Sequence, residues 1–388
     1  MKIVQFVNNL EMGGLERLAL ELAFCQKNAG HEPLIYCLTH RGHLADEAES
    51  AGIRVTTFEK PGGPSITTAR SIISALKRDR PDVLHTHNHL VHHYGVVAGR
   101  LAGIPLIVNT MHGGEFNISE QGAQFVATTK SPDRKGDLLY RATVRWTDAV
   151  VSISGATRQF LIKHRHLPVH KTHVILNGAP LDRFANCPAS PGAALPRVRF
   201  GTASRFVAEK DHFTLLRAFA QVARSLTHAE LNIAGDGPLR IRIESLAEEL
   251  GIKERVILHG PIRDMPKFLS QLDIFVMSSL NEGLPIVILE AMAAGLPIVS
   301  TRAGGIDEAA IKGVNARFVE PGDVDGLARE MTRMAECPNL VEIGAHGREI
   351  VSKRFQIEQT WREYERLFDR LKAEKHSPRW EHARDLSR

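Results

Sequence analysis

Short apolar segments alternate with amphipathic helical segments along most of the 388 residues, and this alternation constrains the fold more than any other feature of the sequence. The first unit runs from Lys2 to Val7, continues through Gly13-Gly14, and enters a periodic helix from Leu15 to about Ala29. Apolar runs of this length are typical of parallel strands buried on both faces and joined by helices. The sequence therefore predicts a doubly wound α/β architecture.

The alternation occurs twice, with a break between the two rounds. In the first round, further strands are expected at residues 33–37, 55–58, 83–86, 106–109 and 149–153, with helices at 69–80 and 94–102. In the second round, strands are expected at 199–203, 230–234, 256–259, 274–277 and 298–300, with helices at 214–225, 240–250 and 286–294. Between them, ANCPASPGAALPR (185–197) has three prolines and no periodicity, which predicts an interdomain linker.

Composition narrows the class of protein. Hydrophobic residues make up 43% and charged residues 24%, as in soluble globular proteins. The four cysteines are far apart, with no metal-binding spacing and no disulfide framework. The apolar start of the chain is too short for a signal peptide, and no later run is long enough to span a bilayer. We therefore expect a cytoplasmic protein.

The net charge of +5 comes from the first half of the chain. Residues 1–185 hold 21 Lys and Arg against 16 Asp and Glu, and the densest basic stretches are 134–145 and 158–171. Such asymmetry indicates an anionic partner, either a phosphate-bearing acceptor or the anionic inner face of the cell membrane. A solvated basic face without a partner is the alternative. No nucleic acid is expected among the partners.

The most informative run is SSLNEGLPIVILEAMAAGLPIVSTRAGGIDE, residues 278–308. It follows a predicted buried strand, and open α/β sheets bind ligands at the carboxyl ends of their strands. Pro285 fits the first position of the next helix, whose free N–H groups then face solvent or an anion. Glu282 would precede this helix and Glu290 would lie in its second turn. Two carboxylates placed this way suit a polyhydroxylated ligand, because each accepts two hydroxyl hydrogen bonds.

This run resembles the Glu-x7-Glu motif of the retaining glycosyltransferases of family 4, also called glycosyl transferases group 1. That family has the GT-B fold, in which two Rossmann-like domains face each other across a cleft. The resemblance implies that Glu282 binds hydroxyls of the donor sugar and that Glu290 binds the ribose of the nucleotide. Gly283, Leu284 and Pro285 would complete this donor-binding loop.

Three further segments resemble motifs of the same family. Gly13-Gly14 is similar to its glycine turn near the donor diphosphate, where backbone N–H groups approach a phosphate closely. In ASRFVAEKDH, Arg205 and Lys210 would contact the diphosphate and neutralise the charge that builds on the leaving nucleotide. GDGP resembles the family's turn beneath the donor, and its glycines are Gly235 and Gly237.

Histidines form the last group of candidates. His112 in NTMHGG matches the family's histidine beside the donor sugar, and we expect it to contact the reacting sugar or polarise the site. Strand alternation would place His85, His87 and His89 on one face, but no carboxylate or cysteine completes a metal site there. His85 or His87 is instead expected to line the acceptor cleft.

The resemblance implies a retaining, metal-independent transferase of the hexosyltransferase type that uses no cofactor besides its nucleotide-diphosphate sugar donor. Residues 1–185 would bind a glycan or lipid-linked acceptor and residues 186–354 the donor, and the helix at about 355–375 would pack back on the first domain. The pathway would be polysaccharide or glycolipid biosynthesis. The alternatives are a nucleotide-sugar epimerase of the same fold and a non-catalytic partner-binding protein that keeps the fold. A Rossmann dehydrogenase is disfavoured because no GxGxxG follows a strand.

Overall fold

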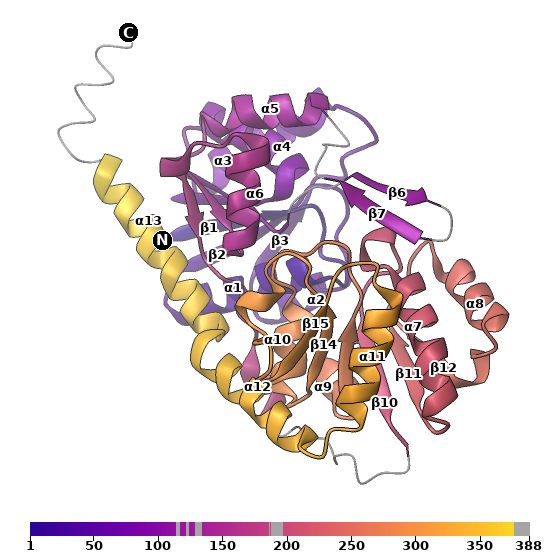
Figure 1. Ribbon diagram of the computed structural model, residues 1–388. Helices are drawn as coiled ribbons and strands as arrows, with labels where there is room; N and C mark the ends of the chain where they lie inside the picture. Colours follow the sequence, from indigo (N-terminus) through magenta and orange to yellow (C-terminus); the bar gives the residue numbers. More distant parts are fainter. Residues whose placement is uncertain (114–116, 122–123, 129–133, 186, 188–196, 376–388) are drawn as a thin grey trace.

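The computed structural model describes residues 1–113, 117–121, 124–128, 134–185, 187 and 197–375. It has two α/β domains, each built around a parallel sheet, with a long C-terminal helix running along one side (Figure 1). The predicted doubly wound architecture is confirmed. None of the helices in these ranges is both long and apolar enough to cross a membrane.

The first sheet has seven strands in the order β3-β2-β1-β4-β5-β8-β9, and all of its pairings are parallel. The bounds of these strands are β1 Lys2–Val7, β2 Glu32–Cys37, β3 Arg54–Thr57, β4 Val83–His87, β5 Leu106–Met111, β8 Ala149–Ser152 and β9 Thr172–Val174. The central strands β4 and β5 are buried along their whole length. Burial on both faces explains why these strands read as continuous apolar runs in the sequence.

Helices cover both faces of the first sheet (Figure 1). They are α1 Gly14–Asn28, α2 Ala45–Ser50, α3 Ile66–Asp79, α4 Asn88–Ala102, α5 Arg134–Val144 and α6 Gly155–Arg165, with the 3-10 turns η1 Val169–Lys171 and η2 Leu181–Phe184. Local capping fixes where several of them begin. Ser65 and Ser154, for example, each accept a hydrogen bond from a backbone N–H of the first turn that they cap.

The second sheet has six parallel strands in the order β12-β11-β10-β13-β14-β15. Its strands are β10 Arg199–Ala203, β11 Glu230–Ala234, β12 Val256–Gly260, β13 Ile274–Met277, β14 Ile298–Thr301 and β15 Ala316–Val319. Its helices and turns are η3 Ala208–Lys210, α7 His212–Ser225, α8 Arg240–Glu249, η4 Lys253–Arg255, α9 Met265–Leu269, α10 Ile286–Ala293, η5 Ile306–Glu308, α11 Val324–Ala335 and α12 Leu340–Arg354. Asp323 caps α11 by accepting a hydrogen bond from Gly326 N.

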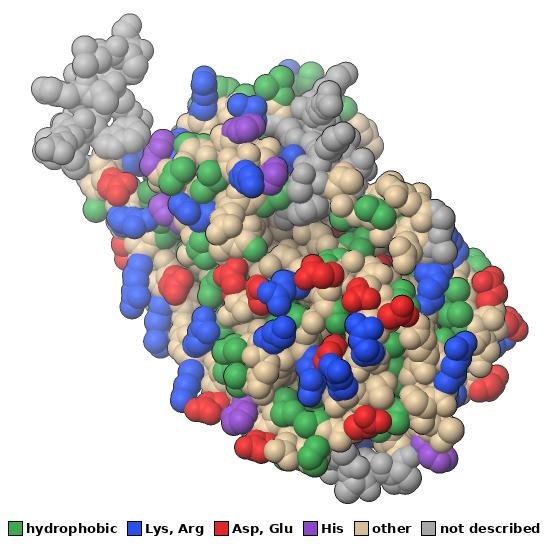
Figure 2. Space-filling model, viewed as in Figure 1, with side chains coloured by type: hydrophobic (Ala, Val, Ile, Leu, Met, Phe, Trp, Pro, Cys, Tyr) green, Lys and Arg blue, Asp and Glu red, His purple; other side chains and the backbone are tan. Residues whose placement is uncertain are grey.

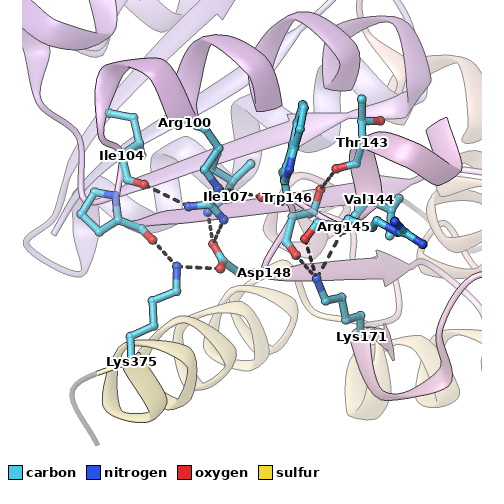
Figure 3. A network of polar contacts seen from close by, with 12 residues as sticks. Arg100, Ile104, Ile107, Thr143, Val144, Arg145, Trp146, Asp148, Lys171 and Lys375 are labelled. Atoms are coloured by element: carbon cyan, nitrogen blue, oxygen red, sulfur yellow. Dashed lines mark hydrogen bonds and ion pairs between the residues drawn. The ribbon is translucent and has the colours of Figure 1, made fainter. Parts of the chain in front are cut away.

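Helix α13, Ile357–Lys375, follows the second domain but contacts α1 and β5 of the first (Figure 1). Lys375 near its end lies 2.6 Å from the Asp148 carboxylate, which also pairs with Arg100 (Figure 3). The division of the chain at residues 185 and 186 stays our proposal, because most of the expected linker lies outside the described residues.

The structure also contains elements that the sequence did not predict. Strands β6 Asn117–Gln121 and β7 Gln124–Thr128 form an antiparallel hairpin, and α5 begins at Arg134. A second difference concerns Pro285, which caps α10 from the preceding position and is not its first residue. A third concerns His89, which lies in α4 and not on β4, since the strand ends at His87 and Asn88 turns the chain with φ +60°.

Candidate active site

In both sheets the order of strands reverses beside the first strand, between β1 and β4 and between β10 and β13. Ligands of doubly wound sheets bind at the carboxyl ends of the strands at such a point. The residues predicted from the sequence follow these strands. Gly13-Gly14 comes after β1, Arg205 and Lys210 come after β10, and Glu282 comes after β13.

Two loops of the second domain are fastened to each other. Ser278, directly after β13, donates its hydroxyl to the carbonyl oxygens of Lys210 and Asp211 at 3.0 and 2.9 Å. Leu280 N donates to the Glu209 carbonyl at 2.9 Å. These bonds hold the segment that carries Lys210 against the segment that carries Glu282.

Lys210 and Glu282 form an ion pair, with Nζ 2.6 Å from Oε1. The Ser279 hydroxyl donates to the same oxygen at 2.7 Å. Only 18% of the Lys210 side chain and 7% of the Glu282 side chain are exposed, so the pair is largely removed from water. An ammonium and a carboxylate fixed side by side offer a phosphate and a hydroxyl adjacent binding positions.

Glu290, in the second turn of α10, is almost fully buried. Burial raises the pKa of its carboxyl from 4.5 to about 7, against the opposing effect of Arg183 and Arg17, while Glu21 adds to the rise. A carboxylate in such surroundings accepts hydrogen bonds strongly, because water does not compete for it.

The turn at Gly235 and Gly237 packs against the segment that carries Arg205. Their φ values of +129° and +156° are open to glycine alone in practice. A side chain at Gly235 would collide with the Ser204 carbonyl oxygen, and one at Gly237 with the backbone of Phe206. The glycines therefore permit a close backbone approach that fixes the loop around the exposed Arg205.

Gly13 lies at the N-terminus of α1, and a side chain there would collide with the Glu16 carboxylate. Burial raises the pKa of Glu16, against the opposing effects of a hydrogen bond from its own backbone and of the charge of Arg205. We did not single out Glu16 from the sequence. The sequence feature that could have identified Glu16 is its place as an acid at the third helical position, which is typical of a capping box.

His112 follows β5 and is held by other buried side chains. Its Nε2 lies 2.9 Å from His87 Nδ1, and His87 Nε2 lies 2.8 Å from Gln5 Oε1. Packing around the ring lowers the pKa of His112 to about 3, so the ring is neutral at pH 7.

The expectation that His85 or His87 lines the acceptor cleft is wrong, because the two side chains are 0% and 1% exposed. His85 bonds to Thr110, which bonds in turn to Tyr364 of α13. Strand β4 is central in its sheet and covered on both faces, which explains why its side chains reach no cleft. His87 contacts the His112 ring directly, and His85 packs against His87.

The two domains meet where His112 faces the donor-binding loop. A side chain at Gly283 would collide with the His112 carbonyl oxygen and with Ile153, and Gly113 lies close to Gly283 N. Asn177 donates to the Leu284 carbonyl at 2.8 Å. The backbone of His112 therefore lies directly against the loop that carries Glu282.

A second contact between the domains involves Glu308, the last residue of the informative run. Its carboxylate accepts hydrogen bonds from Gly155 N and Ala156 N, at 3.0 and 3.1 Å. These are free N–H groups of the first turn of α6, where a negative charge is stabilised. Glu308 thus joins the domains, a role that the sequence did not reveal.

Several cationic side chains of the basic stretch 158–171 make contacts within the first domain. Lys171 donates to the carbonyls of Val144, Arg145 and Thr147 and so closes the end of α5 (Figure 3). Arg165 is 4% exposed and Arg158 donates to the Thr172 carbonyl. These side chains stabilise the first domain through internal contacts, which the spacing of residues in the sequence cannot reveal.

No group of three or more His, Cys, Asp or Glu side chains in the described ranges is arranged to hold a metal ion. Asp323 and Asp325, the one Asp-x-Asp pair of the sequence, lie at the start of α11. Asp323 caps this helix and Asp325 accepts a hydrogen bond from Gln221.

Comparison with known proteins agrees with this arrangement. The sequence profile described as Glycosyltransferase Family 4 matches residues 12–183, and the profile described as Glycosyl transferases group 1 matches residues 189–347. LpsE, a lipopolysaccharide core biosynthesis glycosyltransferase of Rhizobium meliloti, is 28% identical over 367 residues, which cover 92% of this chain and 98% of LpsE. An Escherichia coli UDP-Gal:alpha-D-GlcNAc-diphosphoundecaprenol alpha-1,3-galactosyltransferase is 27% identical over 304 residues, 74% of this chain and 75% of the relative.

Solved structures share the fold. HepE of Anabaena, in complex with UDP and glucose, superimposes with a TM-score of 0.81 at 21% identity, over 95% of this chain and 99% of HepE. Two parallel doubly wound domains that meet at the carboxyl ends of their strands define the GT-B class. Within that class, the chain belongs to the glycosyl transferases group 1 and is a glycosyltransferase.

Proposed function

We propose that this protein transfers a sugar from a nucleotide-diphosphate sugar to a hydroxyl of a glycan or lipid-linked acceptor, with retention of anomeric configuration and without a metal ion. One observation carries the proposal. The Lys210–Glu282 ion pair of the second domain adjoins Gly283, which packs directly against His112 of the first. A donor held by the second domain would thus have its sugar at the boundary with the first.

Each side chain has a chemical task in this proposal. Glu290 accepts hydrogen bonds from the ribose hydroxyls, and Glu282 from hydroxyls of the sugar. Lys210 and Arg205 oppose the negative charge that grows on the diphosphate as the glycosidic bond breaks, which is the task of a metal ion in other transferases. His112, neutral at pH 7, offers a hydrogen-bonding nitrogen to the sugar. Backbone N–H groups at Gly13-Gly14 approach the phosphate.

The retaining outcome follows if the acceptor hydroxyl attacks from the face that the diphosphate leaves. The departing phosphate oxygen then takes the proton of the hydroxyl, and the cations beside it stabilise the separated charges. The relatives support this class of donor and acceptor. HepE is seen with UDP-glucose, and the Escherichia coli relative is named for UDP-galactose and a diphosphoundecaprenol acceptor. We propose polysaccharide or glycolipid biosynthesis as the setting.

A lipid-linked acceptor would bring the protein to a membrane surface, and α5 together with the turn after it, residues 145–146, is the segment that we propose to meet it. Leu138, Leu139 and Trp146 are 67%, 51% and 54% exposed at this end of the first domain. Arg141 and Arg145 are exposed beside them, and Figure 2 shows hydrophobic and basic side chains gathered over this end. Exposed leucine, tryptophan and arginine together are typical of helices that lie in a bilayer interface.

The test of the proposed transfer is a donor panel. Purified protein is mixed with uridine, guanosine and adenosine diphosphate sugars, and donor binding is read from thermal unfolding. A ligand at about 100 times its dissociation constant adds about 2.7 kcal/mol to native stability. Sugar transfer to undecaprenyl-diphosphate glycans then decides the acceptor class. Stabilisation by no nucleotide sugar would contradict the proposal.

A further inference from the structure

The hairpin β6–β7 belongs to the first domain by sequence but packs on the second (Figure 1). Phe125 of β7 is 7% exposed and stacks on Phe213 of α7, with ring centroids 5.2 Å apart and an interplanar angle of 30°. Ile118 and Ala127 pack against the same apolar cluster of the second domain. The hairpin thus contributes to the core of a domain that begins far downstream in the chain.

Arg242 of α8 fastens this contact. Its guanidinium lies 4.9 Å from the Phe213 ring and 6.0 Å from the Phe125 ring. It also pairs with Glu120 of β6 through two hydrogen bonds, one of them 3.1 Å long. A planar guanidinium can stack on rings and bind a carboxylate through its edge at the same time, which lysine cannot do.

The hairpin also contacts the second-domain side of the candidate site and follows His112 along the chain. Strand β7 contacts η3, the turn that ends at Lys210. The hairpin itself begins at Asn117, a few residues after His112. A two-stranded ribbon is marginally stable alone, so its geometry depends on these contacts with the second domain.

We infer that the β6–β7 hairpin is an interdomain clasp, in which Phe125 and Arg242 act as positioning residues that hold His112 opposite the Lys210–Glu282 pair. The kinetic part of this inference rests on the proposed transfer. The structural part, that the hairpin holds η3 in place from the other domain, does not.

The experiment compares Phe125→Ala with Phe125→Tyr, which keeps an aromatic ring, in the full-length protein. Three quantities are measured: kcat of sugar transfer, UDP affinity by calorimetry, and backbone hydrogen exchange of residues 205–211. For Phe125→Ala we expect kcat to fall at least about tenfold, since small misplacements of reacting groups are costly. UDP affinity should fall less than kcat does, since Lys210 opposes mainly the charge of the transition state, and exchange at η3 should accelerate. Phe125→Tyr should retain wild-type behaviour.

The matched control is the double variant Glu248→Gln/Lys253→Gln, which removes an ion pair at the other end of the same helix, within the second domain. It should change none of the three quantities. Unchanged exchange at η3 in Phe125→Ala would overturn the clasp, and so would an equal loss of kcat and UDP affinity, which indicates general destabilisation. If the wild-type protein transfers no sugar, the proposed function fails, and the exchange data alone decide whether the clasp exists.

Discussion

At the residue scale, Glu290 is held in surroundings that favour its neutral form. Burial raises its pKa from 4.5 to about 7, so ionising Glu290 costs more in the folded protein than in the unfolded chain. The stability that the neutral carboxyl contributes is complete below pH 4.5 and is lost as the pH rises through 7. Glu290→Gln removes this titration. Relative to wild type, the unliganded variant should gain about 3 kcal/mol of unfolding free energy between pH 4.5 and pH 8. Denaturant unfolding at both pH values checks this, and a pH-independent difference would contradict it.

The same substitution should weaken donor binding. An uncharged amide accepts weaker hydrogen bonds than a carboxylate, and the loss of such bonds costs about 1.5–3 kcal/mol. We therefore expect Glu290→Gln to bind UDP about 10 to 100 times more weakly at pH 8. Wild-type affinity should itself decline as the pH falls below 7 and the carboxyl is protonated. Calorimetric titration with UDP measures both effects, and equal affinity in both proteins would remove Glu290 from the donor site.

A substitution at Gly283 tests the contact between the two domains. The Cβ of Gly283→Ala would collide with the His112 carbonyl oxygen, so the two domains would have to separate locally. We expect the variant to fold and to lose at least about tenfold in kcat. Gly62→Ala is the control, because its Cβ would meet no atom within 4 Å. Wild-type turnover in Gly283→Ala would show that close apposition of the two loops is not needed.

The sequence located most of the candidate site at this scale because its residues lie in motifs next to predicted strands. It missed Glu16 and Glu308, and it misassigned His85 and His87. For Glu308 and the two histidines, the deciding fact is a partner far away in the chain. Glu308 binds N–H groups of residues 155 and 156, and His85 bonds to Thr110. Such pairings come from tertiary packing and have no local pattern.

At the scale of elements, most strand positions were predicted closely, because buried parallel strands leave a strong apolar signal, but the edge strands β9 and β15 were not predicted. The hairpin β6–β7 was not predicted. Its strands NISEQ and QFVAT have weak alternation, and Phe125 is buried against an apolar cluster of the second domain that includes Phe213. An element that is stabilised by another domain cannot be identified from its own residues.

We predict that helix α5 and the turn after it bind anionic membranes. Replacing Leu138, Leu139 and Trp146 by glutamine should reduce binding to anionic vesicles, and so should Arg141→Gln/Arg145→Gln. Each basic residue near an anionic surface contributes about 1 kcal/mol, so the loss of two should lower partitioning by more than tenfold. The control is Ile241→Gln/Val341→Gln, two exposed apolar residues of the second domain. Vesicle co-sedimentation at low salt tests this, and equal binding to neutral and anionic vesicles would contradict it.

At the scale of the whole molecule, the domains are joined at several separate places. The β6–β7 hairpin holds α7 and α8, Glu308 holds the start of α6, and α13 returns from the second domain to α1. The site lies where the carboxyl ends of both sheets meet. The sequence indicated two domains and their order, since the alternation of strands and helices repeats. The contacts that set their relative placement became visible only in three dimensions.

The central claim is that both domains together carry out a retaining, metal-independent sugar transfer. The most direct test is to determine the anomeric configuration of the product by NMR, with wild-type protein, the nucleotide sugar selected by the donor panel, and EDTA present throughout. We predict that the new glycosidic bond has the same configuration as the bond in the donor, and that EDTA does not change the rate. A product of inverted configuration, or activity that EDTA abolishes and manganese restores, would contradict the account.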